Sequence, residues 1–467
     1  MATIFRYTVN FFLLFLCYFL GGCKKFVTID TPISQLVTGS VFNNAASATA
    51  ALTSIYSQMQ IDSYDMSHNT GLLGDELDNY TSGNIPFFTN NLTAVQSPGP
   101  WTKAYSYIYQ ANAVIEGLQK FEGVDQIIKD QLIGEAKFIR AFWHFYLVNC
   151  YGDVPLVTST DYAVNAIKHR DKKDGIYKQI VSDLEDAQKV LNANYVDGSD
   201  SVVIMDRIRP NKFAATAFLA RVYLYSGDFE NAANSATTVI GNAGLYKLEE
   251  DLNDVFKINS RETIWQLGLP STRFNTYDAE GYVLTGTPTD VAISDRLLNV
   301  FEPGDKRKSI WIGDTTTADG TFYYPNKYKV RAVSTAEPAE EVMMLRLSEQ
   351  FLIRAEARTI LGDVTGAVSD LDTVRIRVGL ASYTGSTDKS SLLTAILHER
   401  QVELFTEWGH RWFDMIRTGA INSIMSGSTG VSHAKGGSWN NNGQQTLFPI
   451  PQSELMRDPN LIQNTGY

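Results

Sequence analysis

The chain has 467 residues, and its 51 acidic and 40 basic side chains give a formal net charge of −11 at pH 7. This acidic balance, without any Lys/Arg-rich run, argues against binding to the phosphate backbone of nucleic acids. The length allows a large buried core, and three cysteines are too few for a disulfide framework.

The N-terminal sequence is typical of an export signal. Residues 9–20 are almost wholly apolar, and Arg6 is the only charged residue before Cys23. Such a segment is typical of a secretory signal and is too short to span a bilayer comfortably. The run Leu-Gly-Gly-Cys that ends at Cys23 resembles a bacterial lipobox, in which cleavage before the cysteine leaves a thiol that receives lipid. We therefore expect a signal peptide at residues 1–22 and a lipid such as palmitate on Cys23. The alternative is an ordinary signal that contains a cysteine by chance.

Two further residues refine this interpretation. Lys24 is not the Asp that commonly retains lipoproteins at the inner membrane, so an outer-membrane location is favoured. Removal of the signal leaves Cys150 as the single free thiol, and we predict that it is a small buried hydrophobic residue.

Helical periodicity dominates the next part of the chain. Apolar residues recur at intervals of three and four over residues 101–118, 131–150 and 176–191, which predicts helices that each bury one stripe. Pro210 is predicted to be the first residue of another helix, because its missing N–H is not needed there.

Two segments, 220–232 and 355–367, share one pattern. Each has an Ala seven residues before a Gly-Asp pair and another Ala five residues after that Gly. Small residues at these points let two antiparallel helices approach closely across a glycine turn, as in tetratricopeptide hairpins. The sequence therefore predicts an all-α, mainly helical fold of tetratricopeptide-type hairpins with long irregular loop insertions and a few short strands.

The boundaries of scaffold and insertions follow from where the helical period is lost. We expect hairpin scaffold at 101–260 and 342–418, and irregular insertions at 69–100, 270–330 and 426–445. Long aperiodic insertions are functional or disordered, and the aromatic content of these argues against disorder. They are predicted to face a ligand or a partner.

Several motifs together resemble the SusD/RagB family of outer-membrane nutrient-binding lipoproteins. The motifs are Glu-Ala-Lys-Phe-Ile-Arg-Ala at 135–141 with Tyr-Gly-Asp-Val-Pro-Leu at 151–156, Arg-Pro-Asn-Lys at 209–212, the block 398–414, and Leu-Phe-Pro-Ile-Pro at 447–451 with Asn460, Gln463, Asn464, Gly466 and Tyr467. The resemblance spans nearly all of residues 23–467, which are expected to form a single domain. Thr465 stands where the family has Pro, a minor departure.

This resemblance implies a function. Members are mostly helical, lie on the cell surface and partner a SusC-like TonB-dependent outer-membrane transporter. They capture glycans, or peptides in some relatives, and are not enzymes. The resemblance therefore implies a lipid-anchored protein with a carbohydrate ligand, no catalytic residue, no cofactor and no nucleic-acid partner.

The block 398–414 is a candidate for chemistry. Glu399, Glu403 and Glu407 share one helix face, but Val402 stands where a zincin helix needs its second His. We interpret the block as structural ion pairing and predict no metal site.

An acidic cluster at Asp75, Glu76 and Asp78 precedes Tyr80. Glycoside hydrolysis needs two carboxylates at a set separation, which sequence does not define. Three neighbouring carboxylates on a loop are usually solvated, which is the first interpretation of the cluster. The alternatives are a catalytic pair, partners of sugar hydroxyls, or an ion site.

Sugar recognition requires aromatic rings that pack on the C–H face of a pyranose and planar polar groups that bind its hydroxyls. The candidates with these side chains are Asp75, Asn79, Tyr80, Phe274, Asn275, Tyr277, Tyr282, Trp311, Tyr323, Tyr324 and Trp439. Any one aromatic is more often local core, but the group is expected to include two or three contacts. Core positions are predicted for Trp101, Trp143, Trp265, Trp408 and Trp412. A glycan hydrolase and a pure protein-interaction scaffold remain the alternatives.

Overall fold

The structure is a computed structural model that describes the chain except residues 1–40, 97–98, 200–201, 271–272, 332–338 and 441–442. The predicted signal peptide at 1–22 and the predicted lipidation site Cys23 lie outside the described residues. Among the residues that are described, no helix combines the length and the apolar character needed to cross a bilayer.

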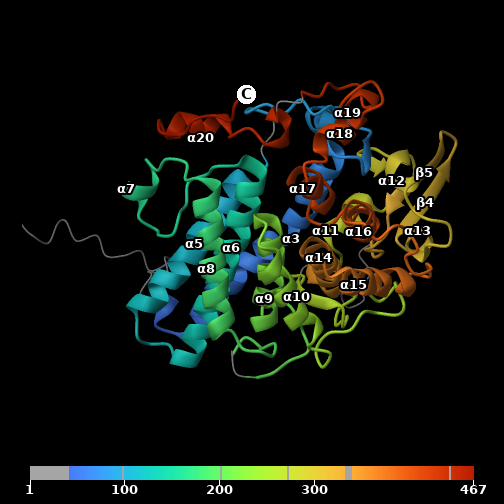
Figure 1. Cartoon of the computed structure of the whole chain (residues 1–467). Coiled ribbons are helices and arrows are strands. Elements are labelled where there is room, and N and C mark those ends of the chain that lie inside the picture. Colours follow the sequence, from blue (N-terminus) through green and yellow to red (C-terminus); the bar gives the residue numbers. More distant parts are fainter. Residues whose placement is uncertain (1–40, 97–98, 200–201, 271–272, 332–338, 441–442) are drawn as a thin grey trace, which may run out of the picture.

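The fold is mainly helical, as predicted, and consists of helices that each pack against the next one along the chain (Figure 1). The long helices are α3 (Ala45–Leu73), α5 (Trp101–Lys120), α6 (Gln126–Tyr151), α8 (Lys173–Val190), α9 (Lys212–Ser226), α10 (Phe229–Ile240), α14 (Leu347–Leu361), α15 (Val364–Arg377) and α16 (Lys389–Glu403). The shorter helices are α4 (Ile85–Phe88), α7 (Tyr162–Asn165), α11 (Tyr277–Tyr282), α12 (Asp295–Leu298), α13 (Lys306–Ile310), α17 (His410–Arg417), α18 (Ile421–Met425), α19 (Val431–Ala434) and α20 (Gln452–Arg457).

The two predicted hairpins are confirmed as α9–α10 and α14–α15. Each turns at a glycine in the left-handed region, Gly227 with φ 82° and Gly362 with φ 88°, where other residues are strained. The following aspartates cap the second helices, since Asp228 accepts from the N–H of Asn231 and Asp363 from that of Gly366. Small residues let α9, α10 and α14 meet closely, and they form one buried cluster: Ala220, Leu224, Ala232, Ala236, Ile353 and Ala357.

Pro210 is not the first residue of α9, which is a correction to the sequence expectation. The helix begins at Lys212, and the side chain of Asn211 accepts a hydrogen bond from the Ala214 N–H at 2.9 Å. The first N–H groups of a helix have no partner within the helix, and the Asn211 side chain satisfies one of them. The helix therefore begins directly after Asn211, two residues later than predicted.

The insertion predicted at 270–330 contains three of the six strands in the described residues, β3 (Val291–Ile293), β4 (Ile312–Thr317) and β5 (Gly320–Pro325). The six strands form three antiparallel pairs: β1 (Leu77–Asn79) with β3, β2 (Thr263–Leu267) with β6 (Val342–Arg346), and β4 with β5. The β4–β5 hairpin projects at the edge of the molecule in Figure 1. A second core cluster lies under the insertion and includes Phe256, Trp311, Tyr328 and Phe405.

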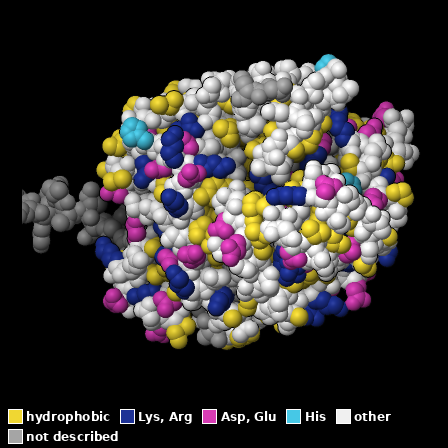
Figure 2. All heavy atoms as spheres, in the orientation of Figure 1, with side chains coloured by type: hydrophobic (Ala, Val, Ile, Leu, Met, Phe, Trp, Pro, Cys, Tyr) yellow, Lys and Arg dark blue, Asp and Glu magenta, His cyan; other side chains and the backbone are white. Residues whose placement is uncertain are grey.

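The predicted core tryptophans are confirmed: Trp101, Trp143, Trp265, Trp408 and Trp412 are at most 3% exposed. Cys150 is buried as predicted, and burial raises the pKa of its thiol far above the usual value. Basic and acidic side chains are intermixed over the face shown in Figure 2, so this face carries no broad field of one sign.

The ion-pairing interpretation of the block 398–414 is confirmed. Arg346 is 1% exposed and donates to Glu403 at 2.6 Å and to Glu407 at 2.8 Å. It also reaches Glu262 at 3.1 Å, and the ammonium of Lys327 pairs with Glu407. The network ties the strand β6 to the end of α16 and therefore joins the helical scaffold to the insertion.

Candidate functional site

Three aromatic side chains gather where β1 ends beside β5. The rings of Tyr80 and Phe322 meet edge to face, with centroids 5.7 Å apart. Phe322 and Tyr324 lie two residues apart on β5 and so point to the same side of the hairpin. Tyr324 lies over Gly313, where a Cβ would come within 2.4 Å of its ring, so the glycine makes room for the tyrosine. We call Tyr80, Phe322 and Tyr324 the aromatic face.

The aromatic face is accessible at its Tyr80 end. Tyr80 is 42% exposed, and Phe322 and Tyr324 are half-buried. The carboxylates of Asp78 and Asp295 lie near the Tyr80 hydroxyl, and together with burial, the larger effect, they raise its pKa. Asp78 pairs with Arg296 at 3.6 Å. The rings are thus bordered by polar groups that can bind hydroxyls.

A second polar group adjoins this face at Asp290. Its backbone oxygen accepts from the N–H of Tyr80 at 2.8 Å, which joins the two regions directly. Its carboxylate accepts from Asn84 Nδ2 at 2.7 Å and from the Tyr64 hydroxyl at 3.0 Å, and it lies 3.2 Å from His68 Nε2. The hydrogen bond from His68, the largest effect, lowers the pKa of Asp290 to about 2, so the carboxylate is ionised at neutral pH. Its side chain is 42% exposed and is therefore accessible from solvent.

The sequence did not indicate several of these residues. Phe322 was one apolar position in a short run, and Tyr64, His68, Asn84, Asp290 and Arg296 carried no pattern of their own. The spacing of two residues between Phe322 and Tyr324 is the one signal available, because alternate residues of a strand share a face.

Asp75 is buried and paired, which corrects the expectation that it is available to a ligand. It is 6% exposed, and its two carboxylate oxygens accept from Arg411 at 2.9 Å and 2.6 Å. The neighbouring Glu76 is 2% exposed, and burial raises its pKa to about 8. Of the acidic cluster, Asp78 alone borders the aromatic face, since the other two carboxylates are turned into the protein.

Three more candidates belong to the core, which is again a correction. Trp311 has no exposed surface, and its indole N–H donates to the carbonyl oxygen of Leu252 at 3.0 Å. Tyr282 is 3% exposed. Asn275 is 4% exposed, and its Nδ2 donates to the carbonyl oxygen of Arg331. At 4% exposure or less, these side chains present too little surface to form a platform for a sugar ring.

The remaining candidates do not join the aromatic face. Asn79 bonds to the backbone of Thr81 through both its oxygen and its Nδ2, so its amide closes a local turn. One face of the Tyr277 ring carries the guanidinium of Arg273, 3.5 Å from the ring centroid. Phe274 is half-buried, Tyr323 is half-buried against the second core cluster, and Trp439 is half-buried with its indole N–H bonded to Asn422.

One group of side chains has the spacing of a metal site. Potential ligand atoms of Glu302, His398 and Glu399 lie within 4.8 Å of one another. Arg375 pairs with both carboxylates, at 2.6 Å and 3.4 Å, and Arg307 lies 2.7 Å from Glu399. Two guanidinium groups already neutralise these acids, which disfavours a cation here.

Comparisons with known proteins cover both ends of the chain. Residues 23–224 match a family model described as "Starch-binding associating with outer membrane", and residues 301–467 match the model of the SusD family. SusD-like protein P2 of Formosa agariphila is 27% identical, with 99% of this chain and 100% of that protein covered.

Solved structures share the fold. A SusD superfamily protein from Bacteroides thetaiotaomicron has a TM-score of 0.77 at 23% identity, with 90% of this chain and 99% of that chain covered. A laminarin-binding SusD-like protein has a TM-score of 0.74 at 24% identity, with 91% of this chain and 100% of that chain covered. The family models, the relatives and the shared fold agree with the sequence motifs, and the chain belongs to the SusD/RagB family.

Proposed function

We propose that this protein binds oligo- or polysaccharide at the outer surface of the outer membrane and passes it to a SusC-like TonB-dependent transporter without cutting it. The observation that carries the proposal is the aromatic face beside the ionised Asp290. Its two half-buried rings are held by the β5 backbone, while the Tyr80 ring is exposed.

Sugar chemistry matches this arrangement. The C–H face of a pyranose packs on an aromatic ring, and its hydroxyls both donate and accept hydrogen bonds. Asp290 supplies an acceptor, and Arg296 supplies donors on the other border of the rings. The site is an open surface with fixed rings and not a closed cavity, so it suits a sugar chain that lies across it. Because such a surface encloses little of the ligand, we expect modest affinity.

The relatives support carbohydrate as the ligand class. One matching family is described as starch-binding, and one structural neighbour binds laminarin. The family resemblance also supports the transporter as the partner. Peptide remains the alternative ligand, because flat rings with ionised borders also accept peptides.

The test is a panel of polysaccharides, including starch and laminarin, offered to residues 24–467 in native affinity gels. We expect at least one neutral polysaccharide to retard the protein, with no rise in reducing ends after prolonged incubation. Retention by no glycan, together with binding of peptides, would overturn the ligand class. Release of reducing ends would instead favour the hydrolase.

Membrane attachment through Cys23 is part of the proposal. Replacing Cys23 with Ser is expected to abolish incorporation of labelled palmitate and to move the protein out of the outer-membrane fraction. Cys150→Ser is the matched control, since that thiol is buried in α6 and should not affect fractionation. Palmitate that persists in the Cys23→Ser protein would contradict the anchor.

A further inference from the structure

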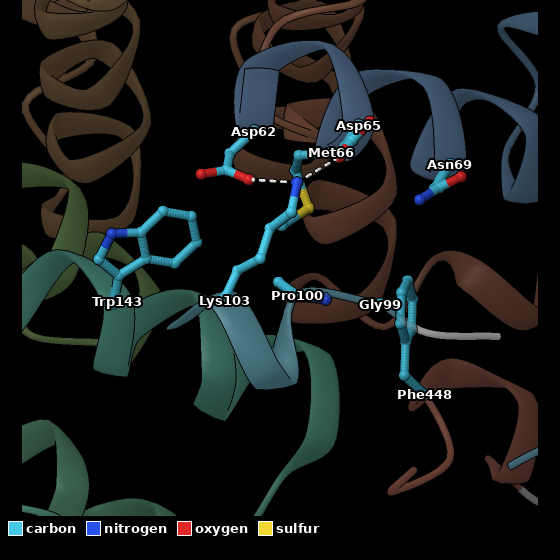
Figure 3. Close-up of a pocket in the computed structure, with 9 residues that line it drawn as sticks. All are labelled: Asp62, Asp65, Met66, Asn69, Gly99, Pro100, Lys103, Trp143 and Phe448. Carbon is cyan, nitrogen blue, oxygen red and sulfur yellow. Dashed lines mark hydrogen bonds and ion pairs between the residues drawn. The ribbon is translucent and has the colours of Figure 1, made fainter. Parts of the chain in front are cut away.

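We propose that a cavity between α3, α5 and α6 binds one neutral sugar unit of hexose size, separately from the aromatic face. The cavity, here called the α3 cavity, is lined by Asp62, Asp65, Met66, Asn69, Gly99, Pro100, Lys103, Trp143 and Phe448 (Figure 3). The inference rests on the proposed function, and it adds a subsite for a free sugar or for the end of a chain.

The size of the cavity sets the first limit on the ligand. Its volume is about 210 Å³. At about 30 Å³ for each molecule of liquid water, this corresponds to roughly seven waters. The space suits a single six-membered sugar ring and is too small for two linked rings, so a longer glycan enters only by its end.

The polar groups lie on two helices that face each other. Four lining residues come from α3, and the Lys103 side chain rises from the first turn of α5 between two of them (Figure 3). The Lys103 ammonium donates to Asp62 Oδ1 at 3.0 Å and to Asp65 Oδ2 at 2.8 Å. The ion pairs hold these groups in place before a ligand arrives, which limits the entropy lost on binding.

Unused hydrogen-bonding capacity remains at the cavity. Within the described part of the chain, the third N–H of Lys103, Oδ1 of Asp65 and Nδ2 of Asn69 have no partner. Two donors and one acceptor in a row match neighbouring sugar hydroxyls, which donate and accept together. The buried Oδ2 of Asp62 makes no hydrogen bond of ordinary geometry among the described residues, and the Tyr107 hydroxyl, which donates to the carbonyl oxygen of Gln58, lies near this carboxylate.

The rest of the wall is apolar. Met66, Pro100 and Phe448 line it, and Phe448 is held by edge contacts with Phe87 and Tyr151 at centroid distances of 6.2 Å and 5.9 Å. Met66 lies on α3 with the polar residues, while Pro100 and Phe448 lie across the cavity from that helix (Figure 3). Apolar surface facing polar groups in this way fits the two faces of a pyranose.

Charge selects against acidic sugars. Two carboxylates, those of Asp62 and Asp65, share the one ammonium of Lys103. Burial raises the pKa of Asp62 to about 6, so this carboxylate is ionised at pH 7.5. The α3 cavity then carries a net negative charge, which disfavours a uronate. Asn69 also connects the two sites, because its Oδ1 lies 3.3 Å from Nδ1 of His68, the residue that contacts Asp290.

The experiment measures binding of single sugars to residues 24–467 at pH 7.5 by saturation-transfer NMR titration. The probes are D-glucose, D-galactose, D-mannose and D-glucuronate. We expect saturable binding of at least one neutral hexose, and at least tenfold weaker binding to Asp65→Ala and Asn69→Leu. The first variant removes the acceptor, and the second fills the cavity and removes the Asn69 donor. Asp174→Ala, an exposed aspartate in the first turn of α8, should bind within twofold of the unchanged protein.

Variants of the aromatic face separate this inference from the proposed function. Tyr80→Ala should leave hexose binding within twofold while it weakens polysaccharide binding. The inference is overturned by any of three results: no hexose binds although a polysaccharide does, the α3 cavity variants bind hexose normally, or glucuronate binds as well as the neutral hexoses. Failure of the polysaccharide as well would overturn the proposed function with it.

Discussion

Arg346→Ala is expected to lower the free energy of unfolding by about 3–5 kcal/mol, the range found when one partner of a buried ion pair is removed. The guanidinium is 1% exposed and lies between Glu262, Glu403 and Glu407. Its loss leaves these buried carboxylates with fewer positive partners, although Lys327 still pairs with Glu407 and Arg377 with Glu262 and Glu403. Chemical denaturation monitored by circular dichroism measures the change.

Arg457→Ala is the matched control for this prediction. That arginine also pairs with a glutamate, Glu454 at 2.8 Å, but its side chain is 72% exposed. A surface pair of this kind contributes about 0–1 kcal/mol. Arg346→Lys adds a second comparison, since it keeps the charge but loses the planar fork that reaches several acceptors. Equal losses for Arg346→Ala and Arg457→Ala would contradict the structural role of the network.

Removing the aromatic face is expected to abolish most polysaccharide binding. In a protein with Tyr80→Ala, Phe322→Ala and Tyr324→Ala together, we expect the dissociation constant to rise at least tenfold, which is about 1.4 kcal/mol or more. The reason is the loss of the three rings on which the sugar packs, while the polar border stays. Isothermal titration calorimetry with the polysaccharide retained in the affinity gels measures the effect.

The control for the aromatic variant uses two tyrosines elsewhere. Tyr109 and Tyr162 are 55% and 84% exposed. They belong to α5 and α7, on the other side of the molecule from the β4–β5 hairpin in Figure 1. Their replacement by Ala should leave binding within twofold. The assignment fails if the control weakens binding as much as the aromatic variant while both proteins keep the melting temperature of the unchanged protein.

The helical framework was predictable because its signals are local. The stripe of residues 131–150 and the Gly-Asp turns at Gly227 and Gly362 each depend on neighbours within a few residues. Helix starts were less certain, since Pro210 and Asn211 both suit the N-terminus of a helix and a single side-chain hydrogen bond decides between them.

The site was less predictable because long-range packing decides which aromatics stay exposed. Trp311 and Phe322 are 11 residues apart in the same aperiodic insertion. Trp311 is enclosed by Phe256 and other residues of the second core cluster. Phe322 instead contacts Tyr80, the residue that directly follows β1. Asp75 is a similar case, because the sequence does not show that Arg411, which is distant along the chain, donates to both of its carboxylate oxygens.

The most direct test is a crystal structure of residues 24–467 with an oligosaccharide cut from the retained polysaccharide. We expect an intact sugar chain with at least one pyranose ring packed within about 4 Å of Tyr80, Phe322 or Tyr324, and hydroxyls bonded to Asp290 or Arg296. A glycan bound on another face with the aromatic face bare, or a cleaved chain in the crystal, would contradict this account.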